Sequence, residues 1–541
     1  PPLLHPLPRP PRRATHPCAI AAMRFPSRQH ALVETRLNAA APTTRFNVSA
    51  ASLDRSIATI GRPASLDHLF STLAAGEPIT MGVFGASVAQ NAGCLDQAQK
   101  RCMGYSGRGG RRKGWAVQFL EHINRSWPHA QHRINNSALD ATPAGGAAGC
   151  LLSYFPRRAH LAIVEFGSMA IENAAKPHDM ERVVRTLLGM PNPPLVLLLS
   201  FPMWCSRWPK SSPHHLFRLG EQLSRAEGHG LYPDYPWATV ETESTRLCQH
   251  YEQACVSVHA GLRDQLVSGE IPLSAIVGED CLHPIHGTQG PELVAQLLAH
   301  WLGHAADVWR QQPRRAAPRR GVARLPRPLY PEENARKRRP TRCYTFRTSL
   351  TGMQALSRVE WCSEQTPANG DNDACWRTPH ATCPDKILSK AGADAEAAYT
   401  KFMASPPSGW FYCFTSLGRG TRKRSEGVAA LVPGAMLRIR LAVADLGAST
   451  VAVQFSYLAS YENMGTAELV CVDACACATQ RLDAHKTDAI GNTSVFLPHE
   501  FNASIRGATC ELQLRVLDET RSGAHKFKVR DLQVQARDEQ I

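Results

Sequence analysis

The stretch ITMGVFGAS at residues 79–87 decides the fold expected for the first half of the chain. Its apolar run, residues 79–84, predicts a buried strand, and Gly85 with Ala86 predicts a tight turn directly after that strand. Ser87 then lies just beyond the carboxyl end of a strand. Open α/β sheets bind their ligands at that edge, so the position of this serine is the first functional clue.

Strand patterns alternate with helical patterns from about residue 66 to residue 308. Two further apolar runs, at 160–166 and 195–200, predict strands, and apolar stripes at helical spacing recur within 115–123, 180–188 and 293–301. Such alternation predicts a doubly wound α/β domain, a parallel sheet with helices on both faces.

The pattern changes to period two in the last part of the chain. Leu437, Ile439 and Leu441 alternate with Arg438 and Arg440, and similar alternation recurs in 451–457 and 512–516. Strands of this kind, separated by turns that contain Gly or Asn, predict an antiparallel β-sandwich.

These patterns divide the 541 residues into four expected regions. They are a disordered Pro/Arg-rich N-terminal region at 1–65, an α/β domain at 66–308, a basic Pro-rich linker at 309–342 and a Cys-rich β-sandwich-like domain at 343–541. No apolar run approaches the roughly 20 residues that span a bilayer, so we expect no transmembrane span.

Much of the net charge lies in one segment. Between Arg310 and Arg342 there are twelve Lys or Arg and two Glu, so this segment carries +10 of the total of +15. Its six Pro favour an extended, solvated linker over a folded nucleic-acid-binding face. A tether for polyanions is the alternative, and steep salt dependence of binding would mark it.

Cysteine usage and sequons indicate an oxidising compartment. Nine of the 17 Cys lie from Cys343 onward, a density typical of secreted domains with disulfides. Five Asn-x-Ser/Thr sequons point the same way, at Asn47, Asn124, Asn135, Asn492 and Asn502. We therefore expect a glycoprotein of the secretory pathway or the extracellular space. Because the chain starts at Pro1 rather than Met, we expect that a targeting peptide is missing from it.

Ser87, Asp280 and His283 form a candidate catalytic set. Asp280 and His283 lie three residues apart in GEDCLHP, residues 278–284. At this spacing a carboxylate can hold one imidazole nitrogen while the other faces a hydroxyl, as nucleophilic acyl transfer requires. The alternative reading is structural: a serine in a turn of small residues, an Asp bonded to nearby backbone, and a surface histidine.

The order of four motifs resembles that of the SGNH hydrolases, the GDSL-type esterase and lipase superfamily. The motifs are GASVAQNAGC at 85–94, NSALDATP at 136–143, LAIVEFGSM at 161–169 and DCLHP at 280–284, within roughly residues 70 to 305. They look most like a eukaryotic, algal-type branch, and SYENMGTAELVC at 460–471 looks like the β-rich domain that accompanies such modules. The resemblance implies a flavodoxin-like fold, Ser87 as nucleophile, His283 as base and Asp280 as its orienter.

The resemblance also identifies positions for the oxyanion hole, where this chain departs from the family. Ala86 stands at the position of the Asp in the GDSL motif, and that Asp is not the nucleophile of the family. Members usually draw donors from a Gly in the second block and an Asn in the third, besides the backbone of the nucleophile, here Ser87. Asp140 occupies the Gly position, with Ala141 beside it, and a backbone N–H can still donate from either.

Met169 falls on the Asn position and has no side-chain donor. Losing one such donor typically lowers the rate by about a hundredfold or more. Ser168 and Asn173 are the candidate substitutes, while for Met169 itself we favour core packing.

Cys471, Cys475 and Cys477 resemble metal-ligand spacing only loosely, and no His cluster completes a zinc set. We therefore predict disulfides there, and no metal or organic cofactor.

The sequence thus predicts a serine esterase that hydrolyses carboxylic esters, either small acyl esters or O-acyl groups on glycans, with the sandwich as a possible carbohydrate binder. The alternative is a catalytically weak or inactive protein with the same fold that acts in glycan binding, and Asp140 and Met169 motivate it.

Overall fold

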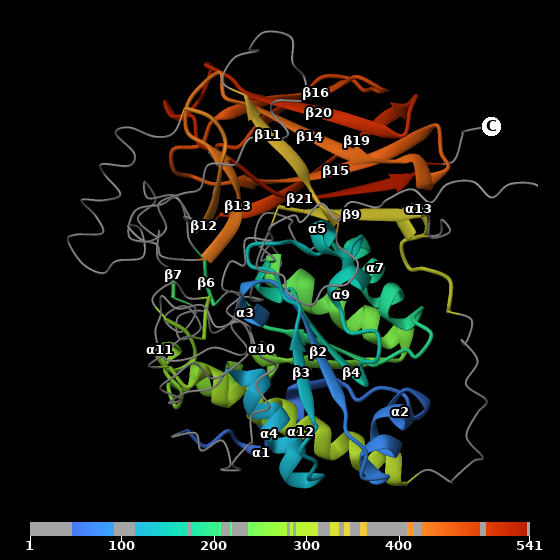
Figure 1. Ribbon diagram of the computed structural model, residues 1–541. Coiled ribbons are helices and arrows are strands. Elements are labelled where there is room, and N and C mark those ends of the chain that lie inside the picture. The colour runs from blue at the N-terminus through green and yellow to red at the C-terminus, as the bar shows by residue number, and fades with distance from the viewer. Residues whose placement is uncertain are drawn as a thin grey trace, which may run out of the picture. The chain divides into compact units, whose positions relative to one another are not determined.

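The structure is a computed structural model (Figure 1). It describes residues 46–90, 114–169, 176–202, 204–206, 217–218, 236–278, 282–284, 288–311, 325–334, 340–346, 357–364, 408–415, 424–486 and 494–537.

The first sheet has six strands in the order β1-β8-β5-β4-β2-β3. Their bounds are β1 Ile57–Thr59, β2 Thr80–Gly85, β3 Arg133–Asn136, β4 Leu161–Glu165, β5 Leu195–Ser200 and β8 Ala254–Ser257. All neighbours pair in parallel except β1, which runs antiparallel to β8. In chain order the five parallel strands follow the flavodoxin-like order 2-1-3-4-5. Every residue of β2, β4, β5 and β8 is buried, as in a parallel sheet covered on both faces.

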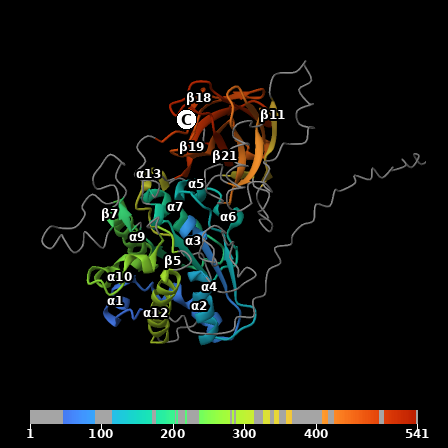
Figure 2. The ribbon, with the colours of Figure 1, turned by 90° about the vertical axis from the view of Figure 1, so that its left-hand side faces the viewer.

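The helices cover both faces of this sheet (Figures 1 and 2). The first group, whose members pack on one another, comprises α1 Ala50–Arg55, α2 Pro63–Ala74, α4 Trp115–Ser126, α10 Val258–Val267 and α12 Gly290–Arg310. The second comprises α5 Ala144–Ala148, α6 Leu151–Tyr154, α7 Pro177–Leu188, α9 Pro236–Tyr251 and α13 Pro331–Asn334. Because α2 and α10 of the first group and α7 and α9 of the second all contact β5, the two groups lie on opposite faces. The predicted doubly wound α/β fold is confirmed.

Short elements complete this part of the chain. They are α3 Ser87–Gln90, the 3-10 helix η2 Gly167–Met169, α11 Leu273–Ile276, and an antiparallel pair of β6 Cys205–Ser206 and β7 Phe217–Arg218.

The later part of the chain forms two further sheets, in which all pairs are antiparallel except β9 with β10. One sheet contains β9 Thr341–Thr345, β10 Ser357–Arg358, β12 Phe411–Thr415, β13 Arg424–Ala430, β15 Thr450–Ala459, β17 Cys475–Ala476, β19 Val495–Ile505 and β21 Phe527–Ala536. The other contains β11 Glu360–Glu364, β14 Met436–Ala442, β16 Thr466–Val472, β18 Gln480–Asp483 and β20 Thr509–Val516, and the 3-10 helix η4 is Ala444–Leu446. The predicted antiparallel architecture is confirmed.

The period-two pattern of β14 has its expected cause. Leu437, Ile439 and Leu441 are buried in the core between the two sheets, while the alternating Arg438 and Arg440 are only partly buried. Strand β15 differs, because its polar residues Gln454 and Ser456 are buried as well. Gln454 donates to the carbonyl of Gly145 in α5 at 3.3 Å, so the outer face of this strand is covered by the α/β part.

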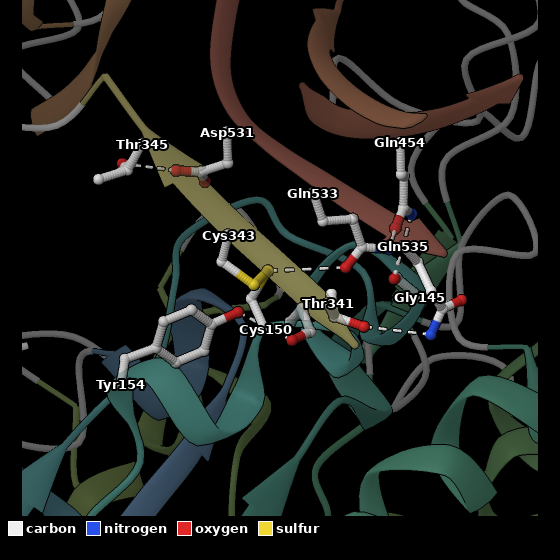
Figure 3. Close-up of a disulfide and its surroundings, with 11 residues drawn as sticks. Gly145, Cys150, Tyr154, Thr341, Cys343, Thr345, Gln454, Asp531, Gln533 and Gln535 are labelled. Carbon is white, nitrogen blue, oxygen red and sulfur yellow. Dashed lines mark hydrogen bonds between the residues drawn. A yellow bond between two sulfur atoms is a disulfide. The ribbon is translucent and has the colours of Figure 1, made fainter. Parts of the chain in front are cut away.

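A disulfide joins the two parts of the chain (Figure 3). Cys150, directly before α6, bonds to Cys343 of β9, and the two residues are 193 positions apart. Gln533 of β21 lies in the same place, with its Oε1 3.6 Å from the Cys150 sulfur.

Ordered elements also lie inside two regions that we expected to be irregular. Helix α1 and strand β1 fall within 1–65, and α13 falls within the basic linker at 309–342. The buried Glu181 carboxylate of α7 accepts the backbone N–H groups of Leu329 (2.5 Å) and Tyr330 (3.1 Å), which docks this stretch on the α/β part. The most basic runs of that linker lie outside the described residues.

No helix among the described residues is both long and apolar enough to cross a membrane.

Candidate active site

Ser87 begins α3, immediately after β2, and is 8% exposed. The turn before it depends on Gly85, whose φ is +155° and at which an added Cβ would lie 2.0 Å from the carbonyl oxygen of Glu165. The next N–H, that of Ala86, donates to the same carbonyl at 3.1 Å. The serine is therefore held where β2 and β4 meet.

His283 lies beside this serine. Its Nε2 is 2.7 Å from the Ser87 Oγ, although 196 positions separate the two residues. With the imidazole proton on Nδ1, Nε2 accepts from the hydroxyl and can take its proton during attack on a carbonyl. His283 is partly buried, and its carbonyl accepts from the N–H of Gly278 at 3.1 Å. Asp280 lies outside the described residues.

The second block continues the parallel pairing of β3 with β2 up to the turn before Ser87. Ser137 N–H donates to the Val83 carbonyl at 2.8 Å, and Leu139 N–H donates to that of Gly85 at 2.9 Å. Asp140 and Ala141 follow directly. Ala141 has a φ of +50°, a conformation that non-glycine residues adopt at a cost, so the special backbone falls one position after the expected Gly position.

Asp140 is buried, and its carboxylate forms an ion pair with Arg530 of β21, with Nη1 and Oδ1 3.3 Å apart. The guanidinium of Arg530, from the part of the chain with the antiparallel sheets, therefore pairs with the Asp140 carboxylate. Asp140 is a residue at which the sequence predicts an oxyanion donor.

The third block forms the turn η2 directly after β4. Ser168 is 1% exposed, and its hydroxyl donates to Glu165 Oε2 at 3.2 Å. This hydroxyl is thus already bonded within the turn. Met169 is buried in the hydrophobic core, as expected for core packing. Asn173 lies outside the described residues.

Glu165 is a residue of the candidate active site that the sequence did not reveal. Burial raises the pKa of its carboxyl to about 7, although hydrogen bonds from Ser168, Ala89 and Gly167 act in the opposite direction. Ala89 belongs to α3, whereas Gly167 and Ser168 belong to η2. The carboxyl therefore joins the helix that carries Ser87 to the turn of the third block. A charged residue at the end of the apolar run LAIVE was the signal that could have revealed it.

Asn136 was also missed. Its side-chain amide donates to the carbonyls of Ala89 (2.9 Å) and Gln90 (3.2 Å), the last two residues of α3. Its Oδ1 accepts the N–H of Ala138 at 3.0 Å. Asn136 thereby links the one-turn helix to the second block.

These segments lie at the switch point of the sheet. Strands β2 and β4 are neighbours, and the chain leaves them toward β3 on one side and β5 on the other. Ser87 follows β2 and η2 follows β4, so both stand at the crevice in which open α/β sheets bind ligands.

The cysteines considered for a metal form disulfides instead. Cys471 bonds to Cys477, and Cys475 bonds to Cys510, as predicted. Among the described residues, another group with metal-ligand atoms in reach of one another is Asp54, His300 and His304, on α1 and α12. Those helices do not carry the candidate active site.

No protein-family model and no curated protein matches the chain. Among solved structures, the chain is similar to a two-domain esterase active on acetylated mannans, at 15% identity and a TM-score of 0.48, over 90% of this chain and 99% of that chain. It is also similar to a family two carbohydrate esterase from Cellvibrio japonicus, at 10% identity and a TM-score of 0.13, over 20% of this chain and 27% of that chain. A third is a carbohydrate-binding module from Cellvibrio mixtus lichenase 5A in complex with cellotriose, at 15% identity and a TM-score of 0.17, over 25% of this chain and 92% of that chain.

Proposed function

We propose that the chain is a serine esterase of the SGNH type, with Ser87 as nucleophile and His283 as general base. The observation that carries this proposal is the 2.7 Å separation of Ser87 Oγ and His283 Nε2 at the switch point of the sheet. A nucleophile and a base within hydrogen-bond reach are the signature of covalent acyl transfer.

The proposed reaction has two half-reactions. The Ser87 Oγ attacks the ester carbonyl while His283 Nε2 takes the hydroxyl proton, and His283 then gives that proton to the leaving alcohol oxygen. In the second half, His283 takes a proton from the water that attacks the acyl-serine and returns it to the leaving Ser87 Oγ, so that the carboxylic acid is released and the hydroxyl is restored. Asp280 is proposed to hold Nδ1 of the imidazole. No metal or organic cofactor takes part in these steps.

The oxyanion of the tetrahedral intermediate is proposed to bind backbone N–H groups of Ser87 and of Asp140 or Ala141. The pairing of Leu139 with Gly85 supports this proposal, because it holds the second block beside the nucleophile turn. The Met169 side chain has no donor, its backbone N–H is bonded to the Phe166 carbonyl, and the Ser168 hydroxyl is bonded to Glu165, so we expect a modest turnover number.

We propose O-acyl groups on glycans as the substrate class, with the sandwich at 343–541 acting in carbohydrate binding and 66–308 as the catalytic domain. The disulfides Cys150–Cys343, Cys248–Cys255, Cys471–Cys477 and Cys475–Cys510 fit an extracellular or secreted protein. A secreted glycoprotein is therefore the proposed state of the chain.

Hydrolysis of p-nitrophenyl acetate tests the proposal. We expect Ser87→Ala and His283→Ala each to lower kcat by about a thousandfold or more, because nucleophile and base act as one unit. Ser71→Ala, at an exposed position of α2, is the matched control and should hydrolyse the ester as fast as wild type. Equal rates for wild type and Ser87→Ala would sink the proposal.

The second candidate function is glycan binding by a catalytically weak protein, which Met169 at the Asn position favours. A glycan array with the full-length wild type and Ser87→Ala separates the two candidates. Strong binding by both proteins without turnover favours the second candidate, whereas Ser87-dependent turnover favours the esterase.

A further inference from the structure

Arg530 of β21 extends from the sandwich into the second block of the candidate active site. It is only 1% exposed. Its Nη1 lies 3.0 Å from the Asp140 carbonyl oxygen and 3.3 Å from Asp140 Oδ1, and its Nη2 donates to Thr142 Oγ1. Its Nε donates to Asp531 at 3.2 Å, and the guanidinium stacks 3.7 Å from the centre of the Phe496 ring. The guanidinium is thus held by charge, hydrogen bonds and an aromatic face.

Strand β19 holds the same loop from a second side. The N–H of Phe496 donates to the Ala141 carbonyl at 2.7 Å, and Ala141 is the residue whose φ is positive. The sandwich therefore contacts three consecutive residues of the second block: Asp140, Ala141 and Thr142. The disulfide between Cys150 and Cys343 joins the same two parts of the chain covalently (Figure 3).

The loop of Asp140 to Thr142 directly follows a residue that bonds to the turn before Ser87. Leu139, which precedes Asp140, donates to the Gly85 carbonyl, and Gly85 precedes Ser87 by two positions. A displacement of Asp140 would therefore change the geometry around Ser87. Oxyanion donors are effective only when they are preorganised, so a small displacement of the loop is costly for the rate.

The charge of Asp140 adds a second reason for a cation at this place. A carboxylate next to a developing oxyanion raises the energy of the transition state by like-charge repulsion. Arginine stays charged at all accessible pH values and pairs with the carboxylate in low-exposure surroundings, where the charges are weakly screened.

We propose that Arg530 is a positioning residue of the active site: it fixes the Asp140–Thr142 loop and neutralises the Asp140 carboxylate, so that a backbone N–H of this loop can serve the oxyanion. The inference rests on the proposed esterase function. It makes the sandwich part of the catalytic machinery, besides any role in glycan binding. It also gives a physical account of an Asp at a position where the family has Gly.

A double-mutant cycle with Arg530→Met and Asp140→Asn tests the inference through the kcat and KM of p-nitrophenyl acetate hydrolysis. We expect Arg530→Met to lower kcat by about ten- to a hundredfold, the order of one oxyanion donor, with KM changed by less than about threefold. Asp140→Asn in the Arg530→Met background should restore about tenfold, because the uncompensated carboxylate is gone. Arg530→Lys should lie between wild type and Arg530→Met, since it keeps the charge but loses the planar fork.

Arg438→Met is the matched control. Arg438 pairs with the buried Glu511 between β14 and β20 of the other sheet, so its loss perturbs the sandwich away from the second block. We expect its kcat to equal that of wild type, and thermal unfolding of every variant separates lost stability from lost positioning.

Wild-type kcat for Arg530→Met, or a double variant no faster than Arg530→Met, would overturn the inference. If Arg530→Met does not fold, the kcat values of Arg530→Lys and of the double variant Asp140→Asn/Arg530→Met decide in its place. The inference is overturned if both kcat values equal that of wild type, or if the double variant also fails to fold. A wild type without Ser87-dependent turnover overturns the esterase proposal and this inference with it, whereas Ser87-dependent turnover that is unaffected at Arg530 overturns this inference alone.

Discussion

At position 165, a carboxyl group lies fully buried between α3, which begins with Ser87, and the turn after β4. Burial raises its pKa from 4.5 to about 7. Its neutral form is therefore favoured by folding. The stability that comes with this raised pKa is fully present below pH 4.5 and is lost as the pH rises through about 7.

Glu165→Gln tests this dependence, because the amide stays neutral at every pH. We expect the unfolding free energy of wild type, relative to that of Glu165→Gln, to fall by about 2 kcal/mol between pH 5 and pH 8. Chemical denaturation of both proteins across this pH range measures the difference. A constant difference would show that the carboxyl titrates normally.

Some residues of the candidate active site could be predicted from the sequence, and others could not. Ser87 and His283 could be selected because each belongs to a short local pattern, and they lie 2.7 Å apart. The pairing of Arg530 with Asp140 could not be foreseen, because the residues are 390 positions apart and meet only through the register of β21 and the docking of two parts. Nothing local in either segment indicates its partner.

The turn between β2 and α3 is the element whose geometry the candidate active site depends on most. Gly85 permits β2 to approach β4 so closely that an added Cβ would lie 2.0 Å from the Glu165 carbonyl oxygen and 2.7 Å from the Ala89 Cβ. Any side chain there must separate the two strands or displace α3, which begins with Ser87.

Gly85→Ala should therefore lower the unfolding free energy by about 3 kcal/mol and reduce esterase activity by at least about tenfold. Gly303→Ala is the matched control, because Gly303 lies inside α12 with nothing within 4 Å of an added Cβ. That substitution should stabilise the protein by about 0.5 to 1 kcal/mol and leave activity unchanged. Thermal and denaturant unfolding, together with ester hydrolysis, measure both. A Gly85→Ala protein as stable and active as wild type would contradict this account of the turn.

Elements were predictable where local pattern and burial agree. Strands β2, β4 and β5 are buried on both faces and so read as continuous apolar runs. Strand β1 was not recognised, because it has three residues and exists through antiparallel pairing with β8, about 200 positions later. Short edge strands of this kind are set by tertiary pairing rather than by their own sequence.

At the scale of the whole molecule, the sequence predicted two architectures but not how they join. The sandwich contacts the α/β part through polar groups that carry no periodic signal, among them Gln454 on Gly145 and Arg530 on Asp140. The Cys150–Cys343 disulfide could not be assigned from 17 cysteines without their positions in space. These contacts connect the sandwich to the loop of Asp140 to Thr142.

The central claim is that this assembly activates Ser87 through His283. Labelling of the full-length protein with a fluorophosphonate probe, followed by peptide mapping, tests it without knowledge of the substrate. The account predicts modification at Ser87 in wild type, none there in Ser87→Ala, and labelling slowed by about a hundredfold or more in His283→Ala, since the base activates the hydroxyl. A wild-type protein that stays unlabelled at Ser87, or that labels as fast without His283, would contradict it.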